Sequence, residues 1–487
     1  MMEKDLRSRR LMNDQMTAED LERINRLVAD TKRFLEMYAT LPYVRDEFNE
    51  DSEAFLAKHH LDVDPEEMKF LVNDEYAQER KRLDEDPDAI DLLPEAAFRF
   101  RQFLANKFAA RDMMIDKYCK PSNPRMIKWR ERQMNRCLAG VGGVNKAFVH
   151  CPLAIELDLG CSVGCDFCGL GAPKLQKICR YTEENAAMFR QILADAHRII
   201  GDAAGFGTLY LATEPLDNPD YELFEGDFVK EFRFIPQITT AVADRDIERT
   251  RRLVHKLYSS AGFIHRFTLR SVEMAEKIFA EFTPMELLRV ELLPMFPEAP
   301  TFVPFTVVGG QAKHVKEEDV REGDPGTICC ADGFVINMAE KSIRLITPCH
   351  MTDKFPNGVA EPVKRYFESA DECAKIMEEI IEEYMITDIP DEEPLRLYPY
   401  LERCETMYGD SLQSRFGGMI FALDKLSRPY AKRVIELLQD GTWNKHEIVR
   451  IVTGEYDANP ENVFWMLNQF WKQGFIYDSK LFGSIQA

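Results

Sequence analysis

The N-terminal 150 residues predict a helical region. Apolar residues recur every three or four positions between Leu21 and Val28, and Thr17 stands where a helix N-cap is expected. Residues 34–71 indicate several short helices separated by turn residues. The basic run KWRERQMNR at 128–136 ends this region, and we expect it to form the solvated face of a helix.

From Cys151 to about residue 350 the pattern changes to an alternation of strand-like and helical segments. The apolar runs AIELDLG, FGTLYLAT and FRFIPQITTAV are separated by helical patterns, and further ones follow near 244–258 and 271–281. Alternation of this kind predicts βαβ units and a parallel sheet. A later segment, GFVINMAEKSIRLITP, predicts two strands joined by a turn at Glu340-Lys341.

The C-terminal part predicts helices again. From about residue 428, three helical patterns are followed by a glycine and a short β-prone end, which is the outline of a winged-helix module. Val463, Leu467 and Phe470 would share one face of its last helix, and residues 475–477 would form the wing. We therefore divide the chain into an N-terminal helical region (1–150), a βα region (151–360), a helical connector (361–427) and a winged-helix-like domain (428–487).

Charge and composition exclude several classes of protein. The chain has 62 basic and 83 acidic side chains, a net charge of −21, which disfavours non-specific binding to nucleic acid. No apolar run approaches the roughly 18–20 residues that cross a bilayer, and the N-terminus lacks the apolar segment of a signal peptide. We expect a cytoplasmic protein with no membrane or nucleic-acid partner. Twelve cysteines in 487 residues are too few for a disulfide framework.

Three cysteines carry the most specific chemical signal. Cys161, Cys165 and Cys168 fall within CSVGCDFC, directly after the strand-like IELDLG. Three thiolates on a tight loop can bind three irons of a [4Fe–4S] cluster, and the fourth iron then remains open to a small molecule. The alternative is a zinc site, which would need a fourth ligand from a remote cysteine or histidine.

The motif CxxxCxxC, with the aromatic Phe167 before its third cysteine, resembles the radical S-adenosylmethionine (SAM) superfamily. The resemblance covers residues 151 to about 350. It implies an α/β fold with a partial (β/α)6 barrel, a [4Fe–4S] cluster bound by the three cysteines, and SAM bound at the open iron. In that family, reductive cleavage of SAM gives a 5′-deoxyadenosyl radical that abstracts a substrate hydrogen atom. An external electron donor such as flavodoxin or ferredoxin would supply the electron.

The same resemblance implies residues that contact SAM. The family often carries a Gly-Gly-Glu-Pro-like motif after the second strand, and Ala212-Thr213-Glu214-Pro215 keeps the Glu-Pro but not the glycines. Other polar residues follow later strands at places where the family contacts the ribose and methionine. The candidates are Phe167, Thr213, Glu214, Thr239, Arg270, Ser271 and Glu291.

Two further resemblances indicate a peptide substrate. The winged-helix-like pattern resembles the recognition elements of enzymes that modify ribosomally made peptides, in which a leader strand adds to the wing edge. GTICCADGFVINMAEKSIRLITPCHMTDKFPNGV resembles a segment of the proteusin-type peptide epimerases. The implied function is L-to-D epimerisation of residues in a ribosomal precursor peptide, with the leader recognised by the C-terminal or N-terminal domain. Residues 34–71 also resemble helical leaders of such peptides, although a plain helical cap is the simpler interpretation.

An epimerase needs a thiol that returns a hydrogen atom to the opposite face of the α-carbon. We expect Cys349, just after the strand SIRLITP, to stand at the barrel mouth as this donor, with Cys330 and Cys329 as further candidates. For any scattered cysteine the alternative is a buried structural thiol. Two other functions remain open: radical C-methylation or cross-linking of a peptide, and a non-enzymatic Fe–S winged-helix regulator.

Overall fold

The computed structural model describes residues 17–85, 92–142, 149–257, 264–301, 310–311, 327–406, 409–416, 420–422 and 429–483. The fold is mixed α/β, and the strands described form several small sheets rather than one closed barrel. The chain divides into two compact units: Met1–Met114 with Thr239–Phe302, and Ile115–Ile238 with Val303–Ala487. Among the described residues, no helix has both the length and the apolarity needed to cross a membrane.

The first unit is mainly helical and contains one three-stranded parallel sheet, β4–β5–β6. The predicted N-cap is confirmed: Thr17 and Asp20 form a capping box at the start of the first helix described. The elements are α2 (Ala18–Thr40), α3 (Val44–Glu50), α4 (Ser52–Lys58), α5 (Pro65–Val72), η1 (Asp74–Tyr76), α6 (Ala77–Glu85), α7 (Glu95–Tyr118, which continues into the second unit), β4 (Thr239–Thr240), α11 (Ile247–Leu257), β5 (His265–Leu269), α12 (Val272–Glu281) and β6 (Val290–Pro294).

Buried cations fasten α2 to the strand-bearing part of this unit. Arg33 donates from its two terminal nitrogens to the carbonyls of Phe279 (2.9 Å) and Phe282 (2.7 Å), at the C-terminal end of α12. The last carbonyls of a helix have no partner inside it, so the guanidinium satisfies them. Lys32 donates in the same way to the carbonyl of Val290 (2.8 Å).

The second unit is built on a four-stranded sheet of order β1-β7-β8-β9. β1 and β7 are parallel, whereas β8 runs antiparallel to β7, and β9 antiparallel to β8. The predicted turn at Glu340-Lys341 is confirmed, and Lys341 adopts a left-handed conformation with φ 57°. The elements up to α13 are α8 (Pro124–Gly140), β1 (Cys151–Glu156), β2 (Asp158–Leu159), β3 (Lys177–Ile178), α9 (Glu183–Ile200), η4 (Gly201–Phe206), η5 (Pro215–Asp217), α10 (Tyr221–Phe232), β7 (Ala331–Asn337), β8 (Ser342–Pro348), β9 (Val359–Tyr366) and α13 (Ala370–Tyr384).

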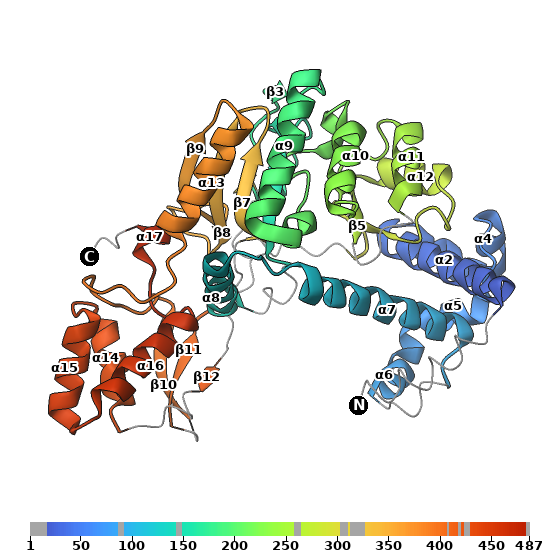
Figure 1. Cartoon of the computed structure of the whole chain (residues 1–487). Coiled ribbons are helices and arrows are strands. Elements are labelled where there is room, and N and C mark those ends of the chain that lie inside the picture. The colour runs from blue at the N-terminus through green and yellow to red at the C-terminus, as the bar shows by residue number, and fades with distance from the viewer. Residues whose placement is uncertain are drawn as a thin grey trace. The chain divides into compact units, whose positions relative to one another are not determined.

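Helices α9 and α13 pack against one another beside this sheet (Figure 1). The sheet itself carries small and branched side chains, and Ala154, Val335 and Ile346 form part of one fully buried cluster. Leu170 packs against this cluster from the loop that bears the three cysteines. The loop is therefore held against the sheet by apolar contact.

The C-terminal part of the second unit contains an antiparallel three-stranded sheet and a group of helices (Figure 1). As predicted, Val463, Leu467 and Phe470 are buried on one face of α16. At the predicted wing, Ile476 forms an antiparallel bridge with Leu397, so this segment already has a strand partner on one side. The elements are β10 (Leu401–Thr406), β11 (Gly409–Ser414), β12 (Ile420–Ala422), α14 (Ala431–Asp440), α15 (Lys445–Tyr456), α16 (Pro460–Lys472) and α17 (Ser479–Phe482).

Two of the predicted strands are much shorter than their apolar runs. In FGTLYLAT only Thr208 pairs, through isolated bridges to Ala154 and Gln237. FRFIPQITTAV contributes only β4, two residues long. Apolar periodicity reports burial rather than hydrogen bonding, so a buried extended segment need not form a regular ladder.

The prediction that the basic run at 128–136 forms a solvated helix face is wrong. The run lies in α8, and Arg130, Arg132 and Arg136 are 6%, 4% and 2% exposed. Each guanidinium donates a hydrogen bond to a group inside the protein. Arg132, for example, donates to the carboxylate of Asp478 at 2.5 Å. Sequence spacing cannot distinguish a charged face that meets water from one that meets buried acceptors.

Candidate functional site

The cysteine trio (Cys161, Cys165 and Cys168) lies on a loop after β1 and β2, as the sequence predicts. All three side chains are partly exposed, whereas seven of the other nine cysteines are buried. Gly164 supplies a left-handed conformation (φ 64°) inside the turn, and the space where a Cβ would stand is open. The loop therefore presents three partly exposed thiols, with no side chain at the turn between the first two.

Backbone N–H groups point at the first sulfur of the trio. The amide of Val163 donates to Cys161 Sγ at 3.4 Å, and the amide of Gly164 interacts with the same sulfur. Burial, the larger effect, raises the pKa of this thiol, and the two amides lower it. Amide donors of this kind stabilise negative charge on sulfur, which is the state in which cysteine binds a metal.

The three sulfurs are not gathered as ligands of a single ion would be. Among the residues that the structure describes, the trio does not meet the spacing of at most 4.8 Å between ligand atoms that one metal ion requires. Thiolates of a [4Fe–4S] cluster each bind a different iron, so they stand farther apart. In this geometry the three sulfurs are not placed to bind one zinc ion together, and their binding of a [4Fe–4S] cluster stays a prediction.

A carboxylate from the second βα segment holds the trio's loop. Asp217 accepts from the backbone amide of Ser162 (2.7 Å) and from its hydroxyl (2.5 Å). This contact was not predicted, because a serine and an aspartate far apart in sequence carry no local signal. The predicted Glu214 is buried beside the same segment, where its carboxylate accepts from the amide of Leu216. Phe167 lies on the trio's loop, and Thr213 directly precedes Glu214. Phe167, Thr213 and Glu214 therefore belong to the same unit as the trio.

The other predicted SAM-contacting residues lie in the first unit, so the structure relates them to each other and not to the trio. Thr239 is paired with Arg266, and Arg266 with Glu291, across β4, β5 and β6. Glu291 accepts from Lys107 at 2.7 Å and pairs with Arg266 at 3.2 Å. Its carboxylate is thus engaged by two cations in this structure.

Arg270 and Ser271 follow β5. Arg270 donates from Nε to the carbonyl of Ala241 at 2.7 Å, and Ser271 is the N-cap of α12, where its hydroxyl accepts from Met274. Both side chains have local structural roles here. Their contact with SAM stays a prediction.

The strand direction places the candidate hydrogen donors differently from the prediction. Because β8 is antiparallel to β7 and β1, the residue after it, Cys349, lies near the beginning of β1, whereas the trio follows the end of β1. Cys330 also lies at the beginning of β1, where its carbonyl accepts from the amide of Cys151. The expectation that Cys349 stands at the same strand ends as the trio is wrong, because periodicity does not reveal strand direction.

Hydrogen bonds nevertheless connect the trio's loop to the turn that follows Cys349. The amide of Cys349 donates to the carbonyl of Gly358 (2.8 Å), and the neighbouring Asn357 side chain donates to the carbonyl of Leu170 (3.4 Å). Burial raises the pKa of Cys349 to about 12, so its thiol keeps its hydrogen at neutral pH. Cys330 is partly exposed, and Cys329 is buried with a raised pKa.

A second group of possible metal ligands was not predicted. Cys137, His150 and Asp332 are all buried, and one ligand atom of each lies within 4.8 Å of the others. His150 Nδ1 and Asp332 Oδ2 are 2.9 Å apart. However, Arg136 donates to Cys137 Sγ at 3.4 Å, and a guanidinium at this position opposes a second cation. Cys137 lies in α8, His150 just before β1, and Asp332 in β7. Because the three are far apart in sequence, no local motif indicates them.

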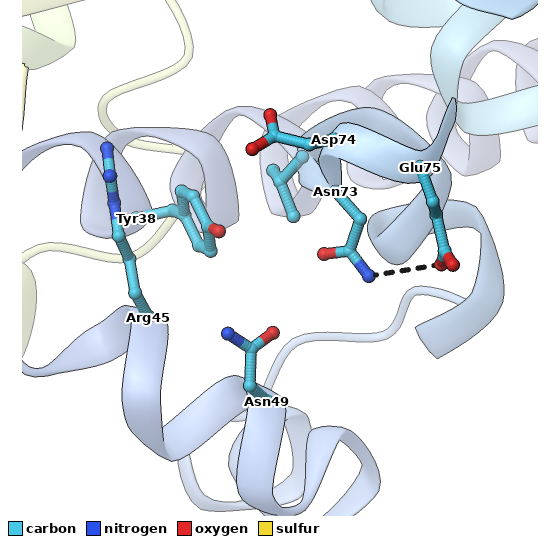
Figure 2. Close-up of a pocket in the computed structure, with 7 residues that line it drawn as sticks. Tyr38, Arg45, Asn49, Asn73, Asp74 and Glu75 are labelled. Carbon is cyan, nitrogen blue, oxygen red and sulfur yellow. Dashed lines mark hydrogen bonds between the residues drawn. The ribbon is translucent and has the colours of Figure 1, made fainter. Parts of the chain in front are cut away.

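A polar cleft of about 520 Å³ lies in the helical N-terminal region (Figure 2). Arg45 stacks on the ring of Tyr38 at 5.1 Å along one wall. Asn49 lies on the same side, and the amide of Asn73 donates to Glu75 on the other. The residues that line the cleft thus include one cation, two side-chain amides and two carboxylates.

Comparison with known proteins gives one informative match. The chain is 30% identical over 407 residues to the uncharacterized protein y4wI of Sinorhizobium fredii, an alignment that covers 80% of this chain and 78% of that protein. No family model matches the chain, and no solved structure matches it.

Proposed function

We propose a function for this chain from its candidate site. The chain belongs to the same family as the uncharacterized protein y4wI, whose name states no activity. We propose that the chain is a radical SAM enzyme that acts on a ribosomally made peptide, with L-to-D epimerisation as the reaction. The observation that carries the proposal is the trio: three accessible thiols on one loop, with amide donors directed at the first sulfur.

Each part of the loop has a role in this proposal. Cys161, Cys165 and Cys168 hold the cluster, and Asp217 fixes the loop through both polar atoms of Ser162. The bound cluster and SAM supply the radical chemistry that removes a hydrogen atom from the substrate. The leader of the precursor peptide binds the C-terminal winged-helix-like part or the N-terminal helical region, where the polar cleft offers contacts.

Cys349 remains the proposed donor although it lies near the beginning of β1, because Asn357, in the turn that follows it, hydrogen-bonds to Leu170 of the trio's loop, and because its thiol keeps its hydrogen. A hydrogen-atom donor must carry an S–H bond, and a thiol of ordinary pKa near 8.5 begins to lose it above neutral pH. The pKa of Cys349 is raised to about 12 by burial, which preserves the bond. Cys330 is the second candidate, because it is partly exposed.

Metal analysis tests the first half of the proposal. After anaerobic reconstitution, we expect about four irons per chain and SAM cleavage to 5′-deoxyadenosine. Replacing any one of the trio by Ala should abolish both, whereas Cys404→Ala, at another partly exposed cysteine, should leave both unchanged. Zinc or no metal in the wild-type chain contradicts the proposal. Metal that disappears in His150→Ala but persists in the trio variants would assign it instead to the buried Cys137, His150 and Asp332 group.

Deuterated buffer tests the second half. Epimerisation should add about one mass unit to each inverted residue, since the donor thiol exchanges with solvent. Cys349→Ala should stop inversion while 5′-deoxyadenosine is still formed, and Cys330→Ala is the matched comparison. A cross-linking or C-methylating enzyme would be indifferent to these changes, and specific DNA retention at moderate salt would favour the Fe–S regulator.

A further inference from the structure

A cavity of about 360 Å³ lies between the turn after β8 and the C-terminal part of the second unit. Its volume is within the lower range of small-molecule sites, roughly 300–1,000 Å³. We call it the aromatic cavity. It is lined by Arg136, Cys349, His350, Thr352, Lys354, Phe355, Tyr398, Pro399, Tyr400, Arg415, Phe416, Tyr477 and Phe482.

Aromatic rings form most of the wall and hold one another in place. Tyr398 and Tyr400 are stacked with their centroids 5.2 Å apart, and His350 is stacked on Phe416 at 3.6 Å. Phe482 packs edge-on against Tyr398 at 5.7 Å. Interlocked rings of this kind give a preformed flat surface, which suits a planar apolar group.

The charges in the wall are all of one sign. Arg136, Lys354 and Arg415 line the cavity, and no Asp or Glu is among the described residues that line it, although Arg415 is also paired with Glu402. Arg136 is 2% exposed, and its hydrogen bonds go to uncharged acceptors: Gln133 Oε1 (2.7 Å), Thr347 Oγ1 (2.8 Å), the carbonyl of Pro348 (2.5 Å) and Cys137 Sγ (3.4 Å). Within the described part of the chain, no carboxylate forms an ion pair with it. Burial opposes the charge of Arg136, but neighbouring groups, Asp332 among them, raise its pKa overall, so the guanidinium is charged. An anionic ligand would add the direct ion pair that it lacks.

Two polar atoms in the wall lack a hydrogen bond of ordinary geometry. Nδ1 of His350 is buried and makes no hydrogen bond, and the buried hydroxyl of Tyr400 makes none of ordinary geometry, although the guanidinium of Arg136 lies beside it. Burial raises the pKa of Tyr400, so its hydroxyl is a donor, and burial lowers the pKa of His350, so its ring is neutral. Buried polar atoms are nearly always paired, and a pair of them beside an unpaired buried cation marks the place of a missing acceptor.

We infer that the aromatic cavity is a binding site for a small aromatic carboxylate, with its ring against the stacked rings and its carboxylate toward Tyr400, His350 and Arg136. The ligand is either a free aromatic acid or the C-terminal aromatic residue of a peptide, since both present the same chemistry. The inference goes beyond the proposed function and does not depend on it: Cys349, the proposed hydrogen donor, also lines the cavity, but the contacts proposed for the ligand involve neither Cys349 nor the trio. Binding can therefore be measured on protein without cluster or SAM.

Isothermal titration calorimetry with 3-phenylpropionate tests the site, and 3-phenylpropanamide serves as its uncharged counterpart. The acid should bind saturably, and the amide at least about tenfold more weakly, because hydrogen bonds to charged groups are the stronger ones. N-acetyl-L-phenylalanine that binds more tightly than 3-phenylpropionate indicates a peptide C-terminus. The reverse order indicates a free acid. Equal affinity for acid and amide, or no saturable binding by any of the three, overturns the inference.

Tyr400→Phe removes only the unpartnered hydroxyl and should weaken acid binding about tenfold. Tyr477→Phe is the matched control, because Tyr477 also lines the cavity but its hydroxyl already donates to the carbonyl of Gly483 (3.1 Å). The control should bind as the wild type does. If both variants weaken binding equally, or neither does, the carboxylate is not held at Tyr400 and the proposed orientation is wrong. Circular dichroism confirms that both variants are folded before binding is compared.

Discussion

Several charged side chains in this protein are buried. In the examples below, an ion pair, a hydrogen bond or an aromatic ring offsets the cost of burying the charge. Arg132 is paired with Asp478 and also stacks over the ring of Trp471 at 3.7 Å. Asp158, just before the trio's loop, accepts from the side-chain amide of Asn218 at 2.8 Å. The compensation is incomplete for Asp158. Burial raises its pKa to about 7, although the hydrogen bond from Asn218 lowers it.

Asp158 therefore makes stability depend on pH. In the unfolded chain this carboxyl ionises near the ordinary aspartate pKa of 3.8, and in the folded chain its pKa is about 7. The protonated carboxyl of Asp158 therefore contributes to the free energy of unfolding below pH 4, and this contribution is lost as the pH rises to 7. Asp158→Asn should thus be as stable as the wild type near pH 4 and more stable at pH 8, by on the order of 2–4 kcal/mol. Urea unfolding at both values measures this.

The exposed substitution Asp388→Asn controls for the loss of one negative charge. A gain in stability for Asp158→Asn that is the same at pH 4 and pH 8 would show that ionisation is not its cause.

The trio could be predicted from the sequence because its three cysteines lie close together along the chain. Asp217 and His150 were missed because each acts on a partner that only folding brings near.

Secondary-structure elements in the second unit are joined by one buried carboxylate. Glu156, in β1, accepts from Arg344 of β8 (2.8 Å), from Asn337 of β7 (3.2 Å) and from the amide of Ala212 (2.9 Å). It is 3% exposed. Three separate segments therefore depend on one side chain for part of their register.

Arg344→Met should destabilise the fold by about 3 kcal/mol, because it leaves the charge of Glu156 buried without its cation. Arg365→Met, which removes a partly exposed arginine from the surface ion pairs of β9 with Glu379 and Glu383, should cost less than about 1 kcal/mol. Chemical denaturation measures both. Adding Glu156→Gln to Arg344→Met should restore part of the loss, and a double variant no more stable than the single one would contradict this account.

Helices were predictable from the sequence to a greater extent than strand pairing was. The patterns near 182–200 and 271–281 became α9 and α12 almost without change, because their apolar positions and their caps Thr182 and Ser271 are local signals. The segment of β10, LERCET, carries no clear alternation, and it pairs with β11 through backbone hydrogen bonds. Strand order and direction depend on residues far apart in sequence, so neither could be derived from periodicity.

At the scale of the molecule, the acidic balance is the dominant electrostatic feature. The net charge of −21 opposes compaction through self-repulsion, whereas exposed ion pairs contribute about 0–1 kcal/mol each. We expect the melting temperature to rise by about 2–4 °C between about 0.01 M and 0.1 M salt, as the screening length falls from about 30 to about 10 Å. Differential scanning calorimetry measures the shift. NaCl and KCl should act equally, and a falling melting temperature would show that specific ion pairs dominate instead.

The two compact units also have a consequence for synthesis. The first unit uses the opening stretch and a middle stretch, Thr239–Phe302, with part of the second unit encoded between them. A ribosome therefore releases the whole of Ile115–Ile238 before the first helices can meet their strand partners. During that delay the side of α2 that packs on α12 and β6 has no partner, so its apolar residues are exposed to aggregation. A gene fragment that stops anywhere before residue 302 encodes neither unit in full, so dissecting this protein by truncation requires an internal deletion or a rejoined chain instead.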